Sequence, residues 1–157
     1  MNSLIEEELP GIHDLRDQLM GMISDQDLTY KLPGSNPTLG ALCEEMGRIQ
    51  QVYIHSFKTG KQDWGDRDSP MEATNSSVAS LKTWYKKLDA ELVEALSGFS
   101  EDDVHHKQID RGHGFTPSLS VQFLIYHEAL LIFYAKASGY LKALEKPYPD
   151  QWKVGIG

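Results

Sequence analysis

One histidine lies on the apolar stripe of the longest helical pattern in the sequence. His127 follows Phe123 by four residues and precedes Leu131 by four, and residues at that spacing share one face of a helix. We therefore expect the imidazole to point into the protein interior. It is either a neutral core histidine held by a hydrogen bond, which we favour, or a metal ligand or acid–base group. Imidazole suits the second role because it is the commonest metal ligand and titrates nearest neutrality.

Glu45 is the second residue that could do chemistry. It comes three residues after Leu42 and four before Ile49, at the edge of an apolar stripe on an earlier helix. A carboxylate there must be paired, bind a metal or turn to solvent, because an unpaired buried charge is very costly. We favour the solvent-facing orientation. The neighbouring Glu44 lies one step further round the helix and is expected to be solvated.

Stronger catalytic signatures are missing from the sequence. No predicted helix contains Glu-x-x-His, so a ferritin-type di-iron site is unsupported. No His-Glu-x-x-His, Cys-x-x-Cys, Gly-x-Ser-x-Gly or phosphate-binding glycine loop occurs either. A polar connection holds His105, His106 and His113, but their irregular spacing favours adventitious metal binding or none.

Four segments have the periodicity of amphipathic helices, and no segment alternates like a strand. The predicted helices cover Pro10 to Ile23, Asn36 to Phe57, Ser77 to Ser97 and Pro117 to Leu144. Asn36 is the expected N-cap of the second helix, with Pro37 at its first position. A short extended piece is expected around 104–109. The pattern predicts an all-α four-helix bundle.

Long polar connections join these helices. The segment 61–77 is too long for an ordinary loop in a compact domain, and segments of that kind are often functional. Its Trp64 is expected to be a packing anchor, with a pocket cap as the alternative. Pro147 and Pro149 end the last helix. We expect residues 1–157 to form a single domain, with 146–157 as an extended tail packed on the bundle.

Composition narrows the function classes. The formal net charge of −8 argues against nucleic acids and anionic membrane surfaces, which select basic patches. The only cysteine is Cys43, so no disulfide can form within the chain. The first ten residues carry three glutamates where a secretory signal would carry positive charge, and no apolar run is long enough to span a bilayer. We expect a cytoplasmic protein.

Two blocks of the sequence resemble the DinB/YfiT-like family of four-helix bundles. The first runs from Pro37 to Met46 and is similar to the opening of the family's second helix. The second runs from Phe123 to Leu131 and is similar to the last core helix, where a His-Glu pair precedes another histidine. The resemblance covers most of the chain. It implies an up-down-down-up or up-down bundle with long connections.

The resemblance also implies a metal site. Members of the family commonly bind one divalent metal through a histidine on helix two and two histidines four residues apart on the later helix. These positions correspond here to Glu45, His127 and Leu131, and leucine cannot bind a metal. We expect a degenerate metal site, because a zinc site normally needs at least three protein ligands.

Two hypotheses about function follow. In the favoured one, zinc, nickel or iron is absent or weakly bound, and the protein binds a small molecule or forms a structural dimer. In the alternative, His127 and Glu45 hold a divalent metal for a thiol transferase or hydrolase-like reaction, as the resemblance implies. We expect a homodimer, because the last helix carries more apolar surface than one bundle seam needs. The residues expected to line a pocket are Tyr134, Phe123, Cys43 and Trp64.

Overall fold

The computed structural model describes residues 1–65 and 77–157. The described elements are η1 (Leu4–Glu8, a π-helical turn), α1 (Asp14–Met22), η2 (Asp27–Thr29, a 3-10 turn), α2 (Leu39–Thr59), α3 (Val78–Ser97), α4 (Glu101–His106), α5 (Leu119–Ala143) and α6 (Asp150–Gly155). Isolated β-bridges join Lys31 to Thr38, Lys61 to Asp110 and Gln108 to Ser118. Within the described ranges no helix has the length and apolar character needed to cross a bilayer.

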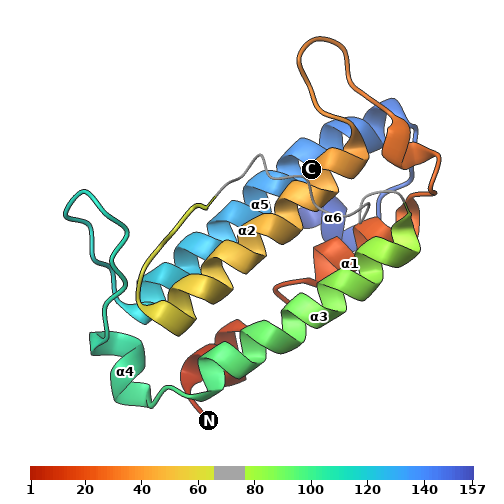
Figure 1. The fold of residues 1–157 in the computed structure, drawn as a ribbon. Coiled ribbons are helices and arrows are strands. Elements are labelled where there is room, and N and C mark those ends of the chain that lie inside the picture. The colour runs from red at the N-terminus through yellow and green to blue at the C-terminus, as the bar shows by residue number, and fades with distance from the viewer. Residues whose placement is uncertain (66–76) are drawn as a thin grey trace.

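The four long helices form two layers. Figure 1 shows α2 and α5 side by side in one layer, with α1 and α3 in the other. Helices α1 and α5 run in one direction, while α2 and α3 run in the opposite direction (Figure 1). The bundle therefore has up-down-down-up topology. Helix α4 lies at the end of the bundle where α3 finishes and α5 begins (Figure 1).

Side-chain caps fix where three of the long helices begin. Thr38, Ser77 and Ser118 each accept a hydrogen bond from a backbone amide three residues further on, which satisfies a group that the first turn leaves open. The predicted cap at Asn36 is wrong, because its side-chain amide donates instead to the Pro33 carbonyl, 2.7 Å away. Helix α2 ends at Gly60, whose φ of 75° is a left-handed conformation that glycine adopts without strain.

The connection before α5 contains helix where an extended piece was expected. Ser100 and Asp103 form a reciprocal capping box that starts α4, so Val104 is helical and buried. Extended backbone begins only after α4, where Gln108 pairs with Ser118. The tail differs from expectation in the same way, because residues 150–155 form helix α6. Its Trp152 is buried and donates to the Leu15 carbonyl, which holds α6 against α1.

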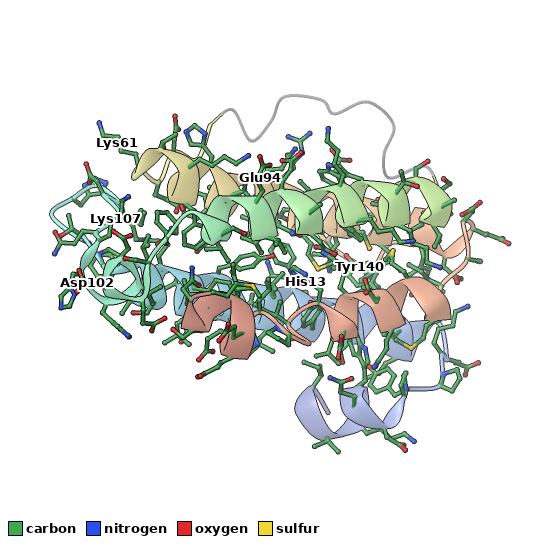
Figure 2. All side chains as sticks on the ribbon, turned by 90° about the horizontal axis from the view of Figure 1, so that it is seen from below. His13, Lys61, Glu94, Asp102, Lys107 and Tyr140 are labelled. Atoms are coloured by element: carbon green, nitrogen blue, oxygen red, sulfur yellow. The ribbon has the colours of Figure 1, made fainter. Side chains whose placement is uncertain are left out.

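Helices α2 and α3 pack closely at Gly47. A Cβ atom built on this glycine would lie 2.3 Å from the Trp84 ring, so no larger residue fits without movement of the ring. Trp84 in turn stacks on Tyr85, with 5.9 Å between ring centroids. The side chains drawn in Figure 2 fill the space between the helices, and the labelled His13 lies among them. This level of the bundle carries the polar groups described next.

Candidate functional site

The structure turns Tyr126, rather than His127, into the bundle. The Tyr126 side chain is fully buried, while His127 is half-buried and lines a groove on the surface. Consecutive residues of an α-helix point about 100° apart, so both cannot face the core. The predicted inward orientation of His127 is wrong, because α5 presents the adjacent position to its neighbours.

The structure does not bring Glu45 and His127 together. Glu45 is exposed on α2. The pairing of Tyr53 with Tyr126, at 5.1 Å between ring centroids, and of Phe57 with Phe123, at 6.4 Å, fixes the antiparallel register of α2 and α5. Glu45 precedes Tyr53 by about two turns, which corresponds to roughly 12 Å along the helix axis. It is therefore level with the later part of α5 and not with His127.

The donor set does not fit a metal ion. Leu131, at the third ligand position that the family resemblance implies, is exposed and has no donor atom. Residues 1–65 and 77–157 contain no group of three or more histidine, cysteine, aspartate or glutamate side chains arranged to hold one. In the histidine-rich connection, His105 pairs with Glu101 and His106 with Asp102, each within α4. His113 is exposed in the following loop.

The predicted pocket residues lie at different depths in the bundle. Tyr134, Phe123 and Cys43 are buried core side chains, and only Phe123 also borders the groove that contains His127. Burial raises the pKa of the Cys43 thiol to about 12, so the thiol stays protonated at neutral pH. Trp64 is half-buried, with its ring edge-on to Tyr53.

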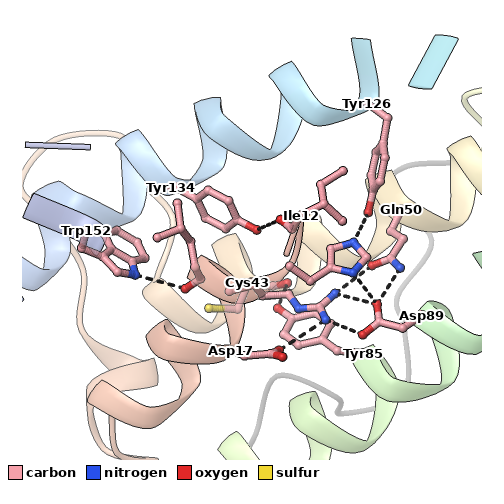
Figure 3. Close-up of polar contacts among 12 residues, drawn as sticks. Ile12, Asp17, Cys43, Gln50, Tyr85, Asp89, Tyr126, Tyr134 and Trp152 are labelled. Atoms are coloured by element: carbon pink, nitrogen blue, oxygen red, sulfur yellow. Dashed lines mark hydrogen bonds and ion pairs between the residues drawn. The ribbon is translucent and has the colours of Figure 1, made fainter. Parts of the chain in front are cut away.

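A polar network crosses the centre of the bundle (Figure 3). Asp89 on α3 is its hub. One oxygen, Oδ1, accepts hydrogen bonds from His13 Nδ1 at 3.0 Å, Arg16 Nη1 at 3.1 Å and Gln50 Nε2 at 2.9 Å. The other, Oδ2, accepts from Arg16 Nη2 at 2.6 Å. The bidentate contact with Arg16 is the geometry in which guanidinium and carboxylate groups bind most strongly.

Arg16 is the most deeply buried charge of this network, with 1% of its side chain exposed. Its guanidinium lies over the Tyr85 ring, 4.5 Å from the centroid, and Nη1 also donates to Gln50 Oε1. Burial opposes the charge, but the hydrogen bonds and charge of Asp89 outweigh it and raise the pKa of Arg16. For Asp89, hydrogen bonds from His13 and Arg16 similarly outweigh burial and hold its pKa far below the ordinary value of 3.8. The pair is therefore ionised across the physiological range.

The chain of groups Asp89, His13 and Tyr126 has the order of a proton relay. Because Nδ1 of His13 donates to Asp89, Nε2 is free to accept from the Tyr126 hydroxyl, 2.8 Å away. However, Tyr126 is fully buried, and burial raises its pKa well above 10. No substrate can reach that hydroxyl. These hydrogen bonds join α3 and α5 through His13, the N-cap of α1.

The groove beside His127 is open to solvent instead. It has a volume of about 520 Å³, which is within the range of small-molecule sites. Three elements border it: η1, α4 and the first turns of α5. The lining residues are Ser3, Leu4, Glu7, Glu8, Glu101, Val104, His105, Ser120, Val121, Phe123, Leu124 and His127.

Apolar and acidic groups are both present in the groove. Leu4, Val104 and Phe123 are buried and contribute apolar surface. Hydrogen bonds from the Ser3 hydroxyl and amide lower the pKa of Glu101, so this carboxylate is ionised at neutral pH. Glu7 and Glu8 form no ion pair with any side chain that the structure describes. The groove therefore combines an apolar floor with a negatively charged rim.

Comparison with known proteins identifies the architecture. No protein-family model matches the sequence, and no curated protein matches it. A DinB-like protein from Bacillus cereus has 15% sequence identity and a TM-score of 0.70 over 88% of this chain and 89% of its own. The DinB-like protein YjoA from Bacillus subtilis has 16% identity and a TM-score of 0.66 over 94% of this chain and 96% of its own. The chain has the DinB-like fold.

Sequence patterns predicted this DinB-like fold but did not predict the polar network inside it. Arg16, Gln50 and Asp89 each stand among apolar residues that repeat at helical spacing. A polar residue at a core position must find a partner there. Three such residues on three predicted helices were a signal that they would meet. The groove of this DinB-like bundle had no comparable signal, because η1 and α4 contribute to it from outside the long helices.

Proposed function

We propose that this DinB-like protein binds a small amphipathic cation in the groove lined by His127. The groove supports this proposal because it combines a volume of about 520 Å³, an apolar floor and a rim of carboxylates. An ammonium group would interact with Glu7, Glu8 and Glu101, while the apolar part of the ligand would cover Leu4 and Phe123. Burial of apolar surface supplies most of the affinity of such sites, and the few polar groups fix orientation.

The experiment compares two probes of similar shape and opposite charge. Isothermal titration calorimetry would measure the binding of phenethylamine and of phenylacetate. We expect phenethylamine to bind and to lose affinity at least several-fold in the Glu7→Gln/Glu8→Gln double variant, whereas the affinity for phenylacetate should not fall in that variant. Asp150→Gln, a similarly exposed carboxylate outside the groove, is the control and should bind as the wild type does. Equal affinity of the double variant and wild type would contradict the proposal.

Self-association through α5 is a second candidate function. The outer face of this helix exposes Leu124, Leu131 and Ile132, with 54%, 39% and 57% of each residue accessible to solvent. Exposed apolar residues that are contiguous on one helix face mark interaction sites in soluble proteins. Ala135 is exposed beside them and would allow close approach of a second helix.

The charges on this face favour a second copy of the chain as the partner. Glu128 and Lys136 are both exposed, four residues before and four after Ile132. If two α5 helices crossed antiparallel at Ile132, each Glu128 would lie beside the partner's Lys136. Such a self-complementary arrangement is what a two-fold dimer requires.

Sedimentation velocity would test this pairing. We expect a concentration-dependent dimer in the wild type, a monomer in Ile132→Lys, and wild-type behaviour in Val93→Lys, which changes an exposed apolar residue on α3. A wild-type protein that sediments only as a 17.7 kDa species at high concentration would contradict the pairing.

A further inference from the structure

Arg111, in the connection between α4 and α5, is a half-buried cation with no acidic partner among residues 1–65 and 77–157. No carboxylate of the described residues lies within ion-pair distance of its guanidinium. This is unusual in a chain with a net charge of −8, where acidic side chains outnumber basic ones by 23 to 15. Removing part of a guanidinium from water without a counter-ion is costly, so other groups must hold it in place.

A buried amide positions this guanidinium. Arg111 Nη1 donates to Gln122 Oε1 at 2.8 Å. Gln122 is fully buried, and its Nε2 donates to the Ser56 hydroxyl and to Gln62 Oε1. Because these two acceptors fix the amide orientation, the Gln122 oxygen must face Arg111. The arginine is therefore anchored from the core side.

Two aromatic rings form a corner around the same group. The guanidinium carbon lies 5.8 Å from the centroid of Tyr53 and 5.9 Å from that of Trp64. The two rings are nearly perpendicular, at 89°, with 6.4 Å between their centroids. Cation–π attraction holds Arg111 in this corner, in which Tyr53 is buried and Trp64 is half-buried.

The nearest acidic residues in the sequence are occupied elsewhere. Asp63 Oδ1 accepts from the Gly65 amide at 2.9 Å, and Asp110 Oδ1 accepts from the Gly112 amide at 2.8 Å. Each carboxylate thus closes a local turn with a residue two positions further on. Asp110 directly precedes Arg111 in the chain, and Asp63 directly precedes Trp64. Neither carboxylate forms an ion pair with Arg111.

The donor groups of Arg111 are mostly unused. A guanidinium has five N–H groups, and the contact with Gln122 engages one nitrogen. Arg111 is only half-buried, and no other hydrogen bond joins its guanidinium to the described residues.

We propose that Arg111 is the anion-binding residue of a second ligand site, which takes a carboxylate attached to an aromatic or apolar body. The planar N–H fork suits the two oxygens of a carboxylate, and the half-buried Trp64 supplies apolar contact for the rest of the ligand. The site shares no residue with the groove that contains His127. Its ligand has the opposite charge, so the two proposals succeed or fail separately.

Calorimetric titration with phenylacetate tests this site, with phenethyl alcohol as the uncharged counterpart. We expect saturable binding of one phenylacetate at Arg111, at least tenfold weaker binding of the alcohol, and at least tenfold weaker binding of phenylacetate to Arg111→Gln. Lys107→Gln is the matched control, since Lys107 also lies over an aromatic ring, that of Phe99, but outside the site. It should bind as the wild type does. Equal affinity for acid and alcohol would overturn the proposal, as would an unchanged Arg111→Gln.

A second measurement does not depend on how the Arg111 variant folds. In wild-type protein, the indole N–H signal of Trp64, assigned with Trp64→Phe, should shift on addition of phenylacetate with the same saturation as the calorimetric curve. The indole signals of Trp84 and Trp152, which lie away from the site, should not shift with it. A Trp64 signal that stays in place at saturating phenylacetate would also overturn the proposal.

Discussion

The network around Asp89 and the groove around His127 use similar side chains in opposite ways. In the network, carboxylate, guanidinium, imidazole and phenol groups lie inside the bundle and bond to one another. In the groove, the carboxylates of Glu7 and Glu8 face solvent without an ion-pair partner among the described residues. Tyr126 and His127, adjacent on α5, belong one to each region.

This difference predicts which residues stabilise the fold and which are available to bind a ligand. A buried polar group with all its partners present fixes how helices pack, and loss of one partner leaves the others uncompensated. An exposed, unpaired group contributes little to folding and is available to a ligand. We therefore expect substitutions in the network to change the free energy of unfolding, and substitutions in the groove to change only the affinity for a ligand.

The largest expected effect is that of Asp89→Asn. The substitution removes the main counter-charge of the buried Arg16, whose other ionic contact is with the exposed Asp17 at 3.4 Å, and breaking a buried ion pair in this way costs about 3 kcal/mol. Urea denaturation at neutral pH would measure it. Asp102→Asn is the control, because Asp102 is exposed and pairs only with His106, and it should change stability by less than about 0.5 kcal/mol. Similar losses in both variants would show that the network has no special role.

Acid should weaken the stabilising effect of the network around Asp89. The pKa of Asp89 is lowered in the folded protein, so its stabilising effect is complete above its ordinary value of 3.8. The effect is lost progressively as the pH falls below that value, since the unfolded chain then binds a proton that the folded chain excludes. The free energy of unfolding, measured from pH 6 downwards to about pH 2, should fall more steeply in wild type than in Asp89→Asn. Parallel curves would contradict this assignment.

Two consecutive glutamines on α2 allow a matched comparison in which the expected loss of stability is smaller. Gln50 is buried and bonds to both Arg16 and Asp89, whereas Gln51 is exposed. Gln50→Leu should lower the free energy of unfolding by about 1–2 kcal/mol, because two charged partners lose a hydrogen bond. Gln51→Leu should leave it nearly unchanged. If the two variants were equally stable, Gln50 would not be part of a stabilising network.

Metal removal is expected to have the smallest effect. Glu45, His127 and Leu131 do not form a donor set, so we expect protein purified without a metal-affinity tag to hold well below one atom of zinc, nickel or iron per chain. Elemental analysis would measure this content, and His127→Ala should not change it. A stoichiometric metal that disappears in His127→Ala would instead support the metal-dependent alternative.

Periodicity and capping were enough to predict the long helices and, with the two motif blocks, the DinB-like fold. They were not enough to orient α5. This helix carries apolar residues on both faces, so a stripe through Phe123, His127 and Leu131 is as regular as the buried one through Phe123, Tyr126 and Leu130. Only packing against α2 distinguishes them. Which residues pair with Asp89 depends on the same packing, because these residues come from two other elements, α1 with its N-cap His13, and α2.

Tyr126 and His127 provide the most direct test of the central claim that the two regions have separate roles. Tyr126→Phe and His127→Ala would each be measured for urea stability and for phenethylamine affinity. Tyr126→Phe should lose about 1 kcal/mol of stability, because His13 loses its hydroxyl partner, and should bind phenethylamine as the wild type does. His127→Ala should keep its stability within about 0.5 kcal/mol and bind phenethylamine several-fold more weakly. The reverse pattern, with stability lost in His127→Ala and affinity lost in Tyr126→Phe, would contradict the account.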